Sequence, residues 1–493
     1  MVGLWLAASC FAPGLAQTNL LTRPWFEART LHFHTYSCGP TQAVAKLAAR
    51  LEQFNEAYSV LAGAQAVASP PVVVMAFPDH PSLEPFLPVY DGKPANLAAF
   101  FNRGSDENLI ALSLSSTDAH SLEAVFHEYT HLLFRHNELF WPLWLKEGMA
   151  DVYSTFELTG DHSVRIGQPM PLYLALLARQ PMMPLHDLLA VTHDSPEYNE
   201  RERQGVFYAQ SWLLTHYLML GNNPALKARF GQLTTRLRQG EAPEPALTNC
   251  FQKSLPAMEA QLRGYLQRGL FEPLTFSVNA SLYGPRALST RGLSRVEVCF
   301  RLGDQLLRIG RADAAEAYFQ QAHHLAPGSP LGYEGLGLLA AERGDSAEAI
   351  GYLQDALQRS SASYLAAYIY AQQRMRLSAG GNRPRLDAET AADIRARLER
   401  ALTLMPDFGP AHHLLGVLEL MQGNNLKSAE EHLQRAILLE PESQSYRLSL
   451  AQAQVMKNDP AAARRTLESL QRPYIDARIR THAQEMLNEL GPP

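Results

Sequence analysis

Two histidines four residues apart, with a glutamate directly after the first, form the pattern in this chain that most clearly predicts chemistry. His127, Glu128 and His131 lie in the segment 121–135, whose apolar residues recur every three or four positions and predict a helix with one buried face. On such a helix both imidazoles project from the same side, one turn apart, as two ligands of one zinc ion require. Glu128 is turned by about 100° and so is expected beside the ion.

Two carboxylates follow on the next predicted helix. Pro142 is well placed to begin that helix, and the spacing of four residues puts Glu147 and Asp151 on one of its faces. A third zinc ligand and a carboxylate that can orient a ligand are therefore available together. The combined spacing favours one Zn²⁺ ion held by His127, His131 and Glu147 over a pair of hydrogen-bonded structural histidines.

This ligand set predicts a hydrolytic reaction. Three protein ligands leave a fourth position for water, whose pKa zinc lowers toward about 7. Glu128 is then placed to accept the proton of that water and to pass it to a leaving amine. A structural zinc site would need a fourth protein ligand, for which His136 is the nearest candidate.

The residues after the motif exclude one class of zinc peptidase. Metzincins need Gly at position 134 and His at position 137, but this chain has Phe134 and Asn137, and His136 stands one position early.

The two motifs instead resemble those of the gluzincin metallopeptidases. HEYTH at 127–131 and WLKEGMAD at 144–151 look like the peptidase MA-like group, which often carries tetratricopeptide repeats. The resemblance covers about residues 25–270 and implies an α+β catalytic domain, one zinc ion and a peptide or protein substrate. The interval of 15 residues between the second histidine and the glutamate is shorter than in most gluzincins, which requires a tight helical hairpin.

The resemblance also implies roles for residues around the ion. Asp151 should accept the ring N–H of a ligand histidine and so fix its tautomer. Tyr208, in a stretch similar to the Y-x-x-S-W segment of the group, should donate to the oxyanion. Three other side chains are open alternatives for that donor: Tyr173, His186 and His193. A strand at 108–114 would pair with an extended substrate if it lay at the sheet edge.

Composition limits the other classes of function. Lys plus Arg total 43 against 49 Asp plus Glu, a formal net charge of −6, so no overall positive field favours nucleic acid. The four cysteines form no C-x-x-C pair, which excludes zinc ribbons and iron–sulfur sites and leaves histidine and carboxylate as metal ligands.

The N-terminus predicts export. Residues 1–16 are mostly apolar and end in Gly14-Leu15-Ala16 before a polar stretch, as a signal peptide does, although no Lys or Arg precedes the apolar run. A buried first helix is the alternative. No other apolar stretch approaches the length of a transmembrane helix, so we expect an exported periplasmic or extracellular protein.

The rest of the chain divides into two halves. For a metallopeptidase-like domain at 17–270 we expect strands at 30–36, 71–77 and 108–114, a sheet part to about 115, and a helical part after it. Residues 271–289 lack a helical pattern and predict an extended connector.

From 290 to 490 the sequence repeats itself. Leu302-Gly303 and Leu336-Gly337 stand 34 residues apart, as do Ala322 and Ala356, and small residues recur where paired helices must approach closely. These residues resemble the tetratricopeptide repeat and predict an all-α solenoid with a terminal capping helix at 474–490. Such solenoids bind peptides or partner proteins on their concave face.

We therefore expect an α+β gluzincin-like catalytic domain followed by a tetratricopeptide-repeat solenoid, with peptide hydrolysis as the activity. Two alternatives remain. One is a catalytically silent repeat scaffold with a vestigial or structural zinc site, and the other is a hydrolase of non-peptide amides.

Overall fold

The structure is a computed structural model. It describes residues 18–62, 72–90, 93–94, 97, 99–104, 106–116, 119–134, 141–160, 163–199, 201–278, 288–378, 386–472 and 475–491. The predicted signal peptide at 1–16, His136 and Asn137 lie outside these residues. Within the described part, no helix is both long and apolar enough to span a membrane.

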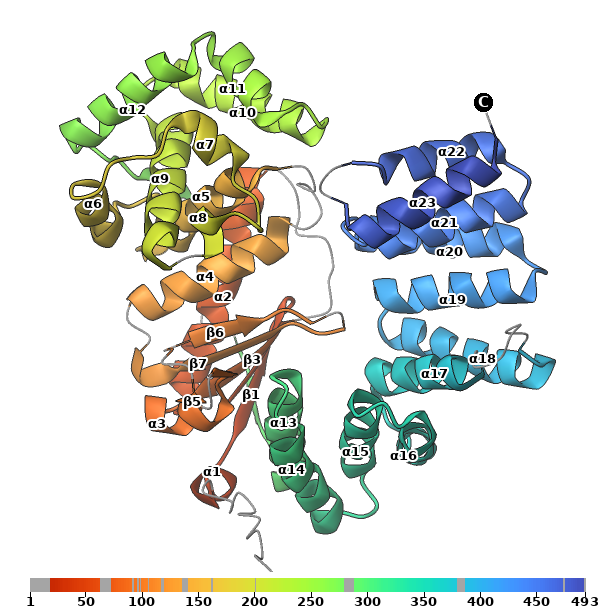
Figure 1. The fold of residues 1–493 in the computed structure, drawn as a ribbon. Coiled ribbons are helices and arrows are strands. Elements are labelled where there is room, and N and C mark those ends of the chain that lie inside the picture. The colour runs from red at the N-terminus through yellow and green to blue at the C-terminus, as the bar shows by residue number, and fades with distance from the viewer. Residues whose placement is uncertain are drawn as a thin grey trace, which may run out of the picture.

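A six-stranded mixed sheet forms the base of the N-terminal half, which confirms that this half is α+β (Figure 1). Its strand order is β11-β1-β2-β3-β7-β6, with β2, β3 and β7 parallel and the other pairs antiparallel. The strands are β1 (Phe26–Arg29), β2 (Phe33–Ser37), β3 (Val72–Phe77), β6 (Ala99–Asn102), β7 (Leu109–Ser113) and β11 (Thr290–Gly292).

The strand expected at 108–114 is β7, and it is not the sheet edge. It pairs with β3 on one side and with β6 on the other, so its backbone hydrogen bonds are already made. The condition under which a substrate could pair with this strand is therefore not met. Among the described strands, β6 is the outer neighbour, and it packs against α4 (Ala119–Phe134).

Both faces of this sheet are buried. The central strand β3 reads VVVMAF, and every one of its residues is inaccessible to solvent. Side chains alternate along a strand, so Val74 and Ala76 join the core beneath α2 (Thr41–Ala62) and α4, whereas Val73 and Met75 pack with the first helices of the solenoid.

Helices predominate from residue 119 to residue 268. After α4 come α5 (Leu143–Ser154), α6 (Pro171–Leu177), α7 (Leu185–Ala190), α8 (Pro196–Asn199), α9 (Arg201–Leu220), α10 (Pro224–Arg238), α11 (Pro243–Phe251) and α12 (Leu255–Arg268). A small sheet of β8 (Glu157–Thr159), β9 (Ser163–Ile166) and β10 (Leu274–Ser277) was not expected from the sequence. Its strands have only three or four residues, too few for alternation to be recognised.

The segment predicted as a connector is held at its ends. Residues 274–277 form β10, which pairs with β9, and residues 290–292 form β11, which pairs with β1. The boundary expected at 290 therefore falls inside a strand of the N-terminal sheet. The shorter remaining elements are α1 (Thr18–Thr22), α3 (His80–Leu83), β4 (Val89–Tyr90) and β5 (Lys93–Pro94).

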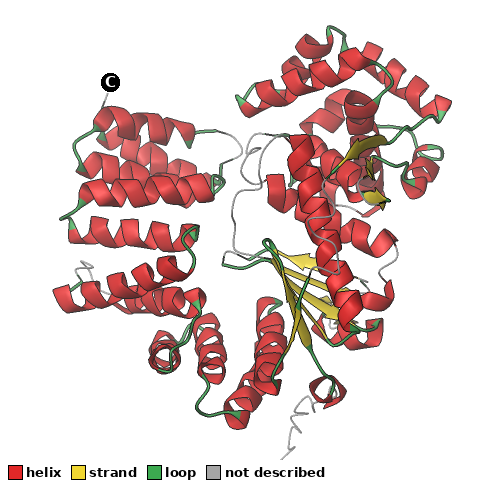
Figure 2. Ribbon diagram, turned by 180° about the vertical axis from the view of Figure 1, so that it is seen from behind, coloured by secondary structure: helices red, strands yellow, loops and turns green. Residues whose placement is uncertain are grey.

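Five helix pairs and a last helix form the C-terminal solenoid (Figure 2). The pairs are α13 (Arg295–Arg308) with α14 (Ala312–Leu325), α15 (Pro330–Glu342) with α16 (Ser346–Gln358), α17 (Tyr364–Ser378) with α18 (Ala388–Leu404), α19 (Gly409–Gln422) with α20 (Leu426–Leu439), and α21 (Gln444–Met456) with α22 (Pro460–Ser469), followed by α23 (Ala477–Glu489). Gly337 allows the close approach within a pair, because a Cβ there would lie 2.6 Å from the Leu353 side chain. The repeat prediction is confirmed.

Candidate metal centre

Helix α4 presents the HEYTH motif on its half-buried side. Its apolar residues fill the core between α2 and α5, and Phe126 stacks on Phe54 with ring centroids 4.4 Å apart. This packing fixes the rotation of the helix, so that His127 and His131 are half-buried and point the same way while Glu128 is exposed. The predicted amphipathic helix is therefore present, with the two histidines at the edge of its buried face.

Helix α5 brings the carboxylates to the histidines. Glu147 is 5% exposed and Asp151 is 3% exposed, because α5 is packed between α4 and α9. Gly148, next to Glu147, makes the contact with α9 possible: a Cβ at this position would lie 2.3 Å from the backbone oxygen of Ser211. The glycine of the WLKEGMAD motif thus determines how closely α5, with both carboxylates, packs against the neighbouring helix.

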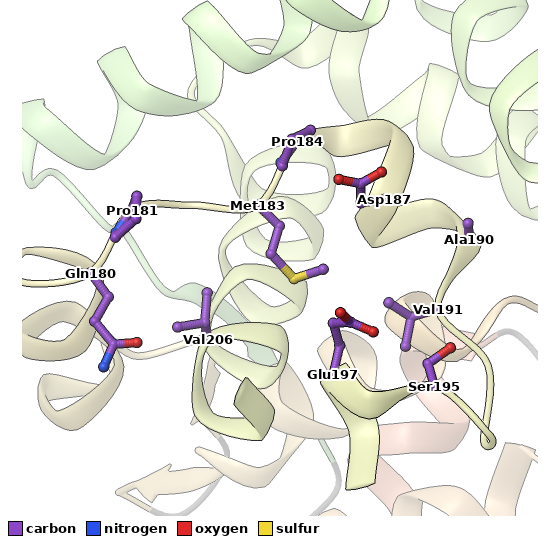
Figure 3. Close-up of a pocket in the computed structure, with 10 residues that line it drawn as sticks. All are labelled: Gln180, Pro181, Met183, Pro184, Asp187, Ala190, Val191, Ser195, Glu197 and Val206. Carbon is purple, nitrogen blue, oxygen red and sulfur yellow. The ribbon is translucent and has the colours of Figure 1, made fainter. Parts of the chain in front are cut away.

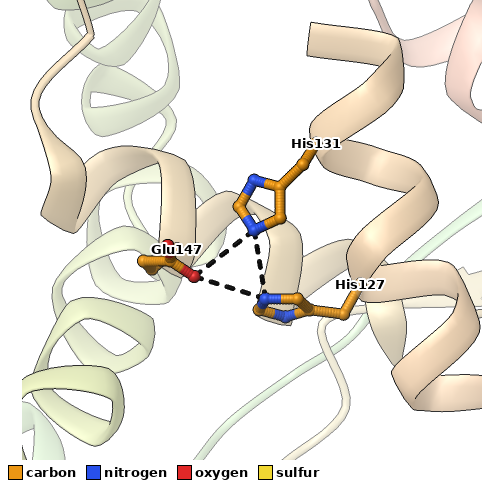
Figure 4. Close-up of side chains that lie close together, drawn as sticks. All are labelled: His127, His131 and Glu147. Carbon is orange, nitrogen blue, oxygen red and sulfur yellow. Dashed lines mark hydrogen bonds and ion pairs between the residues drawn. The ribbon is translucent and has the colours of Figure 1, made fainter. Parts of the chain in front are cut away.

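The three predicted ligand side chains converge (Figure 4). The Nε2 atoms of His127 and His131 are 3.1 Å apart, and each lies 3.3 Å from Oε2 of Glu147. The side chains come from two different helices and point toward a common centre. Among the described residues, these three side chains form the one group of His, Cys, Asp or Glu residues that is arranged to hold a metal ion.

These distances fit a tetrahedral zinc ion. Ligand atoms about 2.0–2.1 Å from such an ion lie about 3.3 Å from one another, which is the edge of the coordination tetrahedron. The observed triangle has edges of 3.1, 3.3 and 3.3 Å. Two imidazoles and one carboxylate are also donors that zinc prefers. The residues therefore match the ion in geometry and in chemistry.

Asp151 contacts the far side of one ligand ring. Its Oδ1 lies 2.8 Å from Nδ1 of His127, which leaves Nε2 of the same ring facing Glu147. Burial lowers the pKa of His127, but Asp151 and Glu147 outweigh it and raise the pKa to about 10. Burial raises the pKa of Glu147, but the two imidazoles lower it to about 2. The centre thus keeps a carboxylate ionised inside the protein.

Tyrosines surround the carboxylates. Tyr208, the predicted oxyanion donor, is half-buried on α9, with its ring centroid 6.1 Å from that of Tyr198 on α8. Burial and the charge of Glu147 raise the pKa of Tyr198, and a hydrogen bond with Tyr208 lowers it. The charge of Glu128 also raises the pKa of Tyr198, so this tyrosine is close enough to interact with both glutamates and with Tyr208.

Tyr198 was missed by the sequence analysis. It stands on a helix of four residues with no helical periodicity or motif around it, so no sequence signal marked it. Only the fold, which packs α8 against α9, brings its ring to the metal centre.

The alternative donors lie in three different places. Tyr173 is beside Asp151, and burial, together with the charge of this aspartate, raises the pKa of the tyrosine. His193 is exposed and packs edge-on against Tyr198, with ring centroids 5.3 Å apart. His186 pairs with Glu244 on the surface, 2.9 Å away, and contacts no residue of the metal centre in the described part.

A cavity of about 540 Å³ lies among α7, α8 and the start of α9 (Figure 3). Helix α8 contributes Glu197 to this cavity and Tyr198 to the metal centre, so one short helix borders both. The described residues that line the cavity are Gln180, Pro181, Met183, Pro184, Asp187, Ala190, Val191, Ser195, Glu197 and Val206.

Comparison with known families identifies the C-terminal half. The family model for the tetratricopeptide repeat matches residues 300–364 and 414–477. No curated protein matches the chain.

Solved structures of repeat proteins resemble this half at low sequence identity. A thermophilic tetratricopeptide repeat protein from Thermus thermophilus is 21% identical, with 39% of this chain and 99% of that chain covered and a TM-score of 0.31. YrrB, described as a repeat protein with an unusual peptide-binding site, is 16% identical, with 38% and 90% covered and a TM-score of 0.32. PilF of Pseudomonas aeruginosa is 17% identical, with 40% and 88% covered and a TM-score of 0.32.

Proposed function

We propose that this protein is a zinc-dependent peptidase of the gluzincin type whose repeat half binds a substrate or partner protein. The observation that supports it is the triangle of ligand atoms from His127, His131 and Glu147, with edges of 3.1–3.3 Å. Zinc bound there supplies a Lewis acid that polarises a carbonyl group and lowers the pKa of water.

The roles of the surrounding side chains follow from their positions. Glu128 is exposed on the same helix as both histidines and is the base that takes up a proton on its carboxylate and returns it to the leaving amine. Asp151 accepts the N–H of Nδ1 of His127, so that Nε2 is the nitrogen that faces the ion and gives up its proton when the metal binds. The hydroxyls of Tyr198 and Tyr208 are the nearby donors for an oxyanion.

Metal analysis and a peptide library test this proposal. The purified chain should contain about one equivalent of zinc, and Glu128→Gln should retain the metal while losing at least about 100-fold in kcat, the range of a general base. Glu123→Gln, the same change on the same helix, serves as the matched control and should cleave normally. Zinc well below one equivalent, or undiminished cleavage by Glu128→Gln, contradicts the peptidase.

The alternative is a repeat scaffold in which the zinc site is structural or vestigial. The match to the tetratricopeptide-repeat family supports a role in which this chain binds other proteins. The described part of the chain supplies three converging ligands, and His136, the candidate for the fourth ligand of a structural zinc site, lies outside it. A chain that holds zinc tightly and captures partners but cleaves neither peptides nor simple amides would support the scaffold.

Export to the periplasm or the cell exterior belongs to the proposal and rests on residues 1–16 alone. Cell fractionation tests it, with N-terminal sequencing of the mature chain. Cytosolic protein that retains residues 1–16 would count against it.

A further inference from the structure

The β6–β7 hairpin reaches from the N-terminal half to the inner side of the solenoid. We call Asn102, at the end of β6, and the described residues 103–104 and 106–107 that follow it the hairpin tip. Figures 1 and 2 show the solenoid as an arc that begins beside the sheet and curves round, so that its inner side faces this hairpin. In the first two pairs, α13 and α15 lie nearer to that inner side than α14 and α16 (Figure 1).

The tip contacts the first repeat through one arginine of α13. Arg308 places Nη1 3.1 Å from Oδ1 of Asp106 and Nη2 3.2 Å from Oε2 of Glu107. Its backbone oxygen accepts a hydrogen bond of 2.6 Å from Asn102. Arg308 is only 11% exposed, so the tip carboxylates shield most of its side chain. The contact is therefore a half-buried, charged interface.

The same tip contacts later repeats. The hydroxyl of Tyr364, on α17, donates to the backbone oxygen of Asp106 at 3.2 Å. Arg103 forms an ion pair with Glu442, in the turn between α20 and α21. The hairpin tip of the N-terminal half thus bridges the beginning and the far part of the solenoid. They occupy the side on which repeat proteins of this class bind extended segments.

The contacts of Arg308 indicate what can replace the tip. Its Nε atom is paired within α13 with Asp304, 3.2 Å away, whereas both terminal nitrogens are paired with tip carboxylates. When the tip leaves, these two nitrogens lose their carboxylates in a poorly hydrated place. A guanidinium there requires a carboxylate that matches its planar fork.

We propose that the hairpin tip is an internal ligand of the solenoid, and that an acidic segment of a partner protein binds the concave face by displacing it. Only molecules with an undocked tip can then bind the partner, so the apparent affinity is the intrinsic affinity multiplied by the fraction of molecules in which the tip is undocked. The proposal goes beyond the proposed peptidase and does not depend on it, because no residue of the metal centre takes part.

A peptide copy of the tip tests the proposal on the full chain. The probe is a synthetic peptide with the sequence of residues 99–108, and the comparison is wild type against Arg103→Ala/Asp106→Asn, which weakens docking of the internal tip. If the tip is docked in about nine molecules of ten, the double variant binds the probe about tenfold more tightly than wild type. A probe with Asn in place of Asp106 should bind both proteins at least tenfold more weakly.

A second variant keeps the test decisive if the double variant folds poorly. Glu442→Gln removes the partner of Arg103 on the solenoid and leaves the tip unchanged. It should therefore tighten binding of a probe that carries Arg103→Ala, because this probe makes no use of Glu442. Arg343→Ala is the control, since this exposed arginine pairs with Asp313 and Glu316 away from the tip. Equal affinity of the probe for wild type and both variants, no binding to any of them, or no preference for the acidic probe overturns the proposal.

Discussion

Oδ1 of Asp151 lies 2.8 Å from Nδ1 of His127, while Nε2 of the same ring lies 3.3 Å from Oε2 of Glu147. The two carboxylates stand one turn apart on α5 and address the two nitrogens of a single imidazole. One end of the ring is therefore held by a buried carboxyl group, and the other end faces the centre where His131 converges. A ligand histidine needs this arrangement, because the nitrogen that binds a metal must carry no proton.

Asp151 should accordingly control metal affinity without being a ligand. We expect Asp151→Asn to weaken zinc binding about tenfold and Asp151→Ala up to about 100-fold, the range for partners of ligand histidines. Competition with a chromophoric chelator measures this without any assay of activity. Asp187→Asn, on α7, is the control and should leave the zinc affinity unchanged. An Asp151→Ala protein with wild-type affinity would show that Asp151 does not orient the ring.

The two tyrosines beside the glutamates should differ in importance. The charges of Glu147 and Glu128 both raise the pKa of Tyr198, whereas Tyr208 lowers this pKa through a hydrogen bond. We expect Tyr198→Phe to lower kcat on the best library peptide by about 100-fold, as loss of an oxyanion donor does, with little change in KM. Tyr208→Phe should cost less than tenfold. The reverse order would assign the donor to Tyr208, as the sequence resemblance implies.

Gly148 should be intolerant of a side chain. A Cβ there would lie 2.2 Å from Oγ1 of Thr215 and 2.3 Å from the backbone oxygen of Ser211, so α5 must move away from α9. Gly148→Ala should destabilise the chain by about 1–3 kcal/mol, as overpacking does, and should weaken zinc binding because Glu147 moves with the helix.

Denaturant unfolding and chelator competition measure the two effects of Gly148→Ala. Gly231→Ala is the matched control, because a Cβ on that helix meets no atom within 4 Å. Alanine is the better helix former, so this control should be neutral or slightly stabilising. Gly148→Ala with unchanged stability and zinc affinity would mean that α5 and α9 can separate freely.

The parts of the site that sequence analysis found are those fixed by helical periodicity. Spacing of four residues places His127 with His131 and Glu147 with Asp151, whatever the rest of the fold does. That the two pairs face each other depends on the packing of α4 and α5, and it was inferred from the combined spacing of the two motifs before the family resemblance was considered. Tyr198 had neither spacing nor motif, so its place beside Glu147 could be found only in three dimensions.

The arrangement of the two halves was harder to predict from the sequence than the site was. The strand VVVMAF indicates a sheet buried on both faces, but the letters do not say which element covers the second face. Here α13 does so, packing with Val73, Met75 and Leu109 in one continuous core. Strand β11, only three residues long, ties the start of the solenoid to β1. The sequence predicted a connector between separate domains because contacts distant in the chain leave no local pattern.

Docking of the hairpin tip should depend on pH through Glu107. Burial raises the pKa of this carboxyl group to about 7, with Arg308 and Arg301 opposing the shift and Asp304 and Asp106 adding to it. Because the docked pKa lies above the ordinary value of 4.5, docking is strongest below about pH 4.5. Docking weakens as pH rises toward 7, because the docked state must then hold an ionised carboxylate beside two other acids. It levels off above that pH, since the carboxyl group is then ionised in both the docked and the undocked state.

Hydrogen exchange measures this dependence. Protection factors of the amides at 106–108, which are corrected for the intrinsic pH dependence of exchange, should fall at least about tenfold between pH 5 and pH 8, the equivalent of one pKa unit. Glu107→Gln cannot ionise and should give a flat profile over the same range. A flat profile in the wild-type protein, or an equal slope in the variant, would mean that Glu107 does not govern docking of the tip.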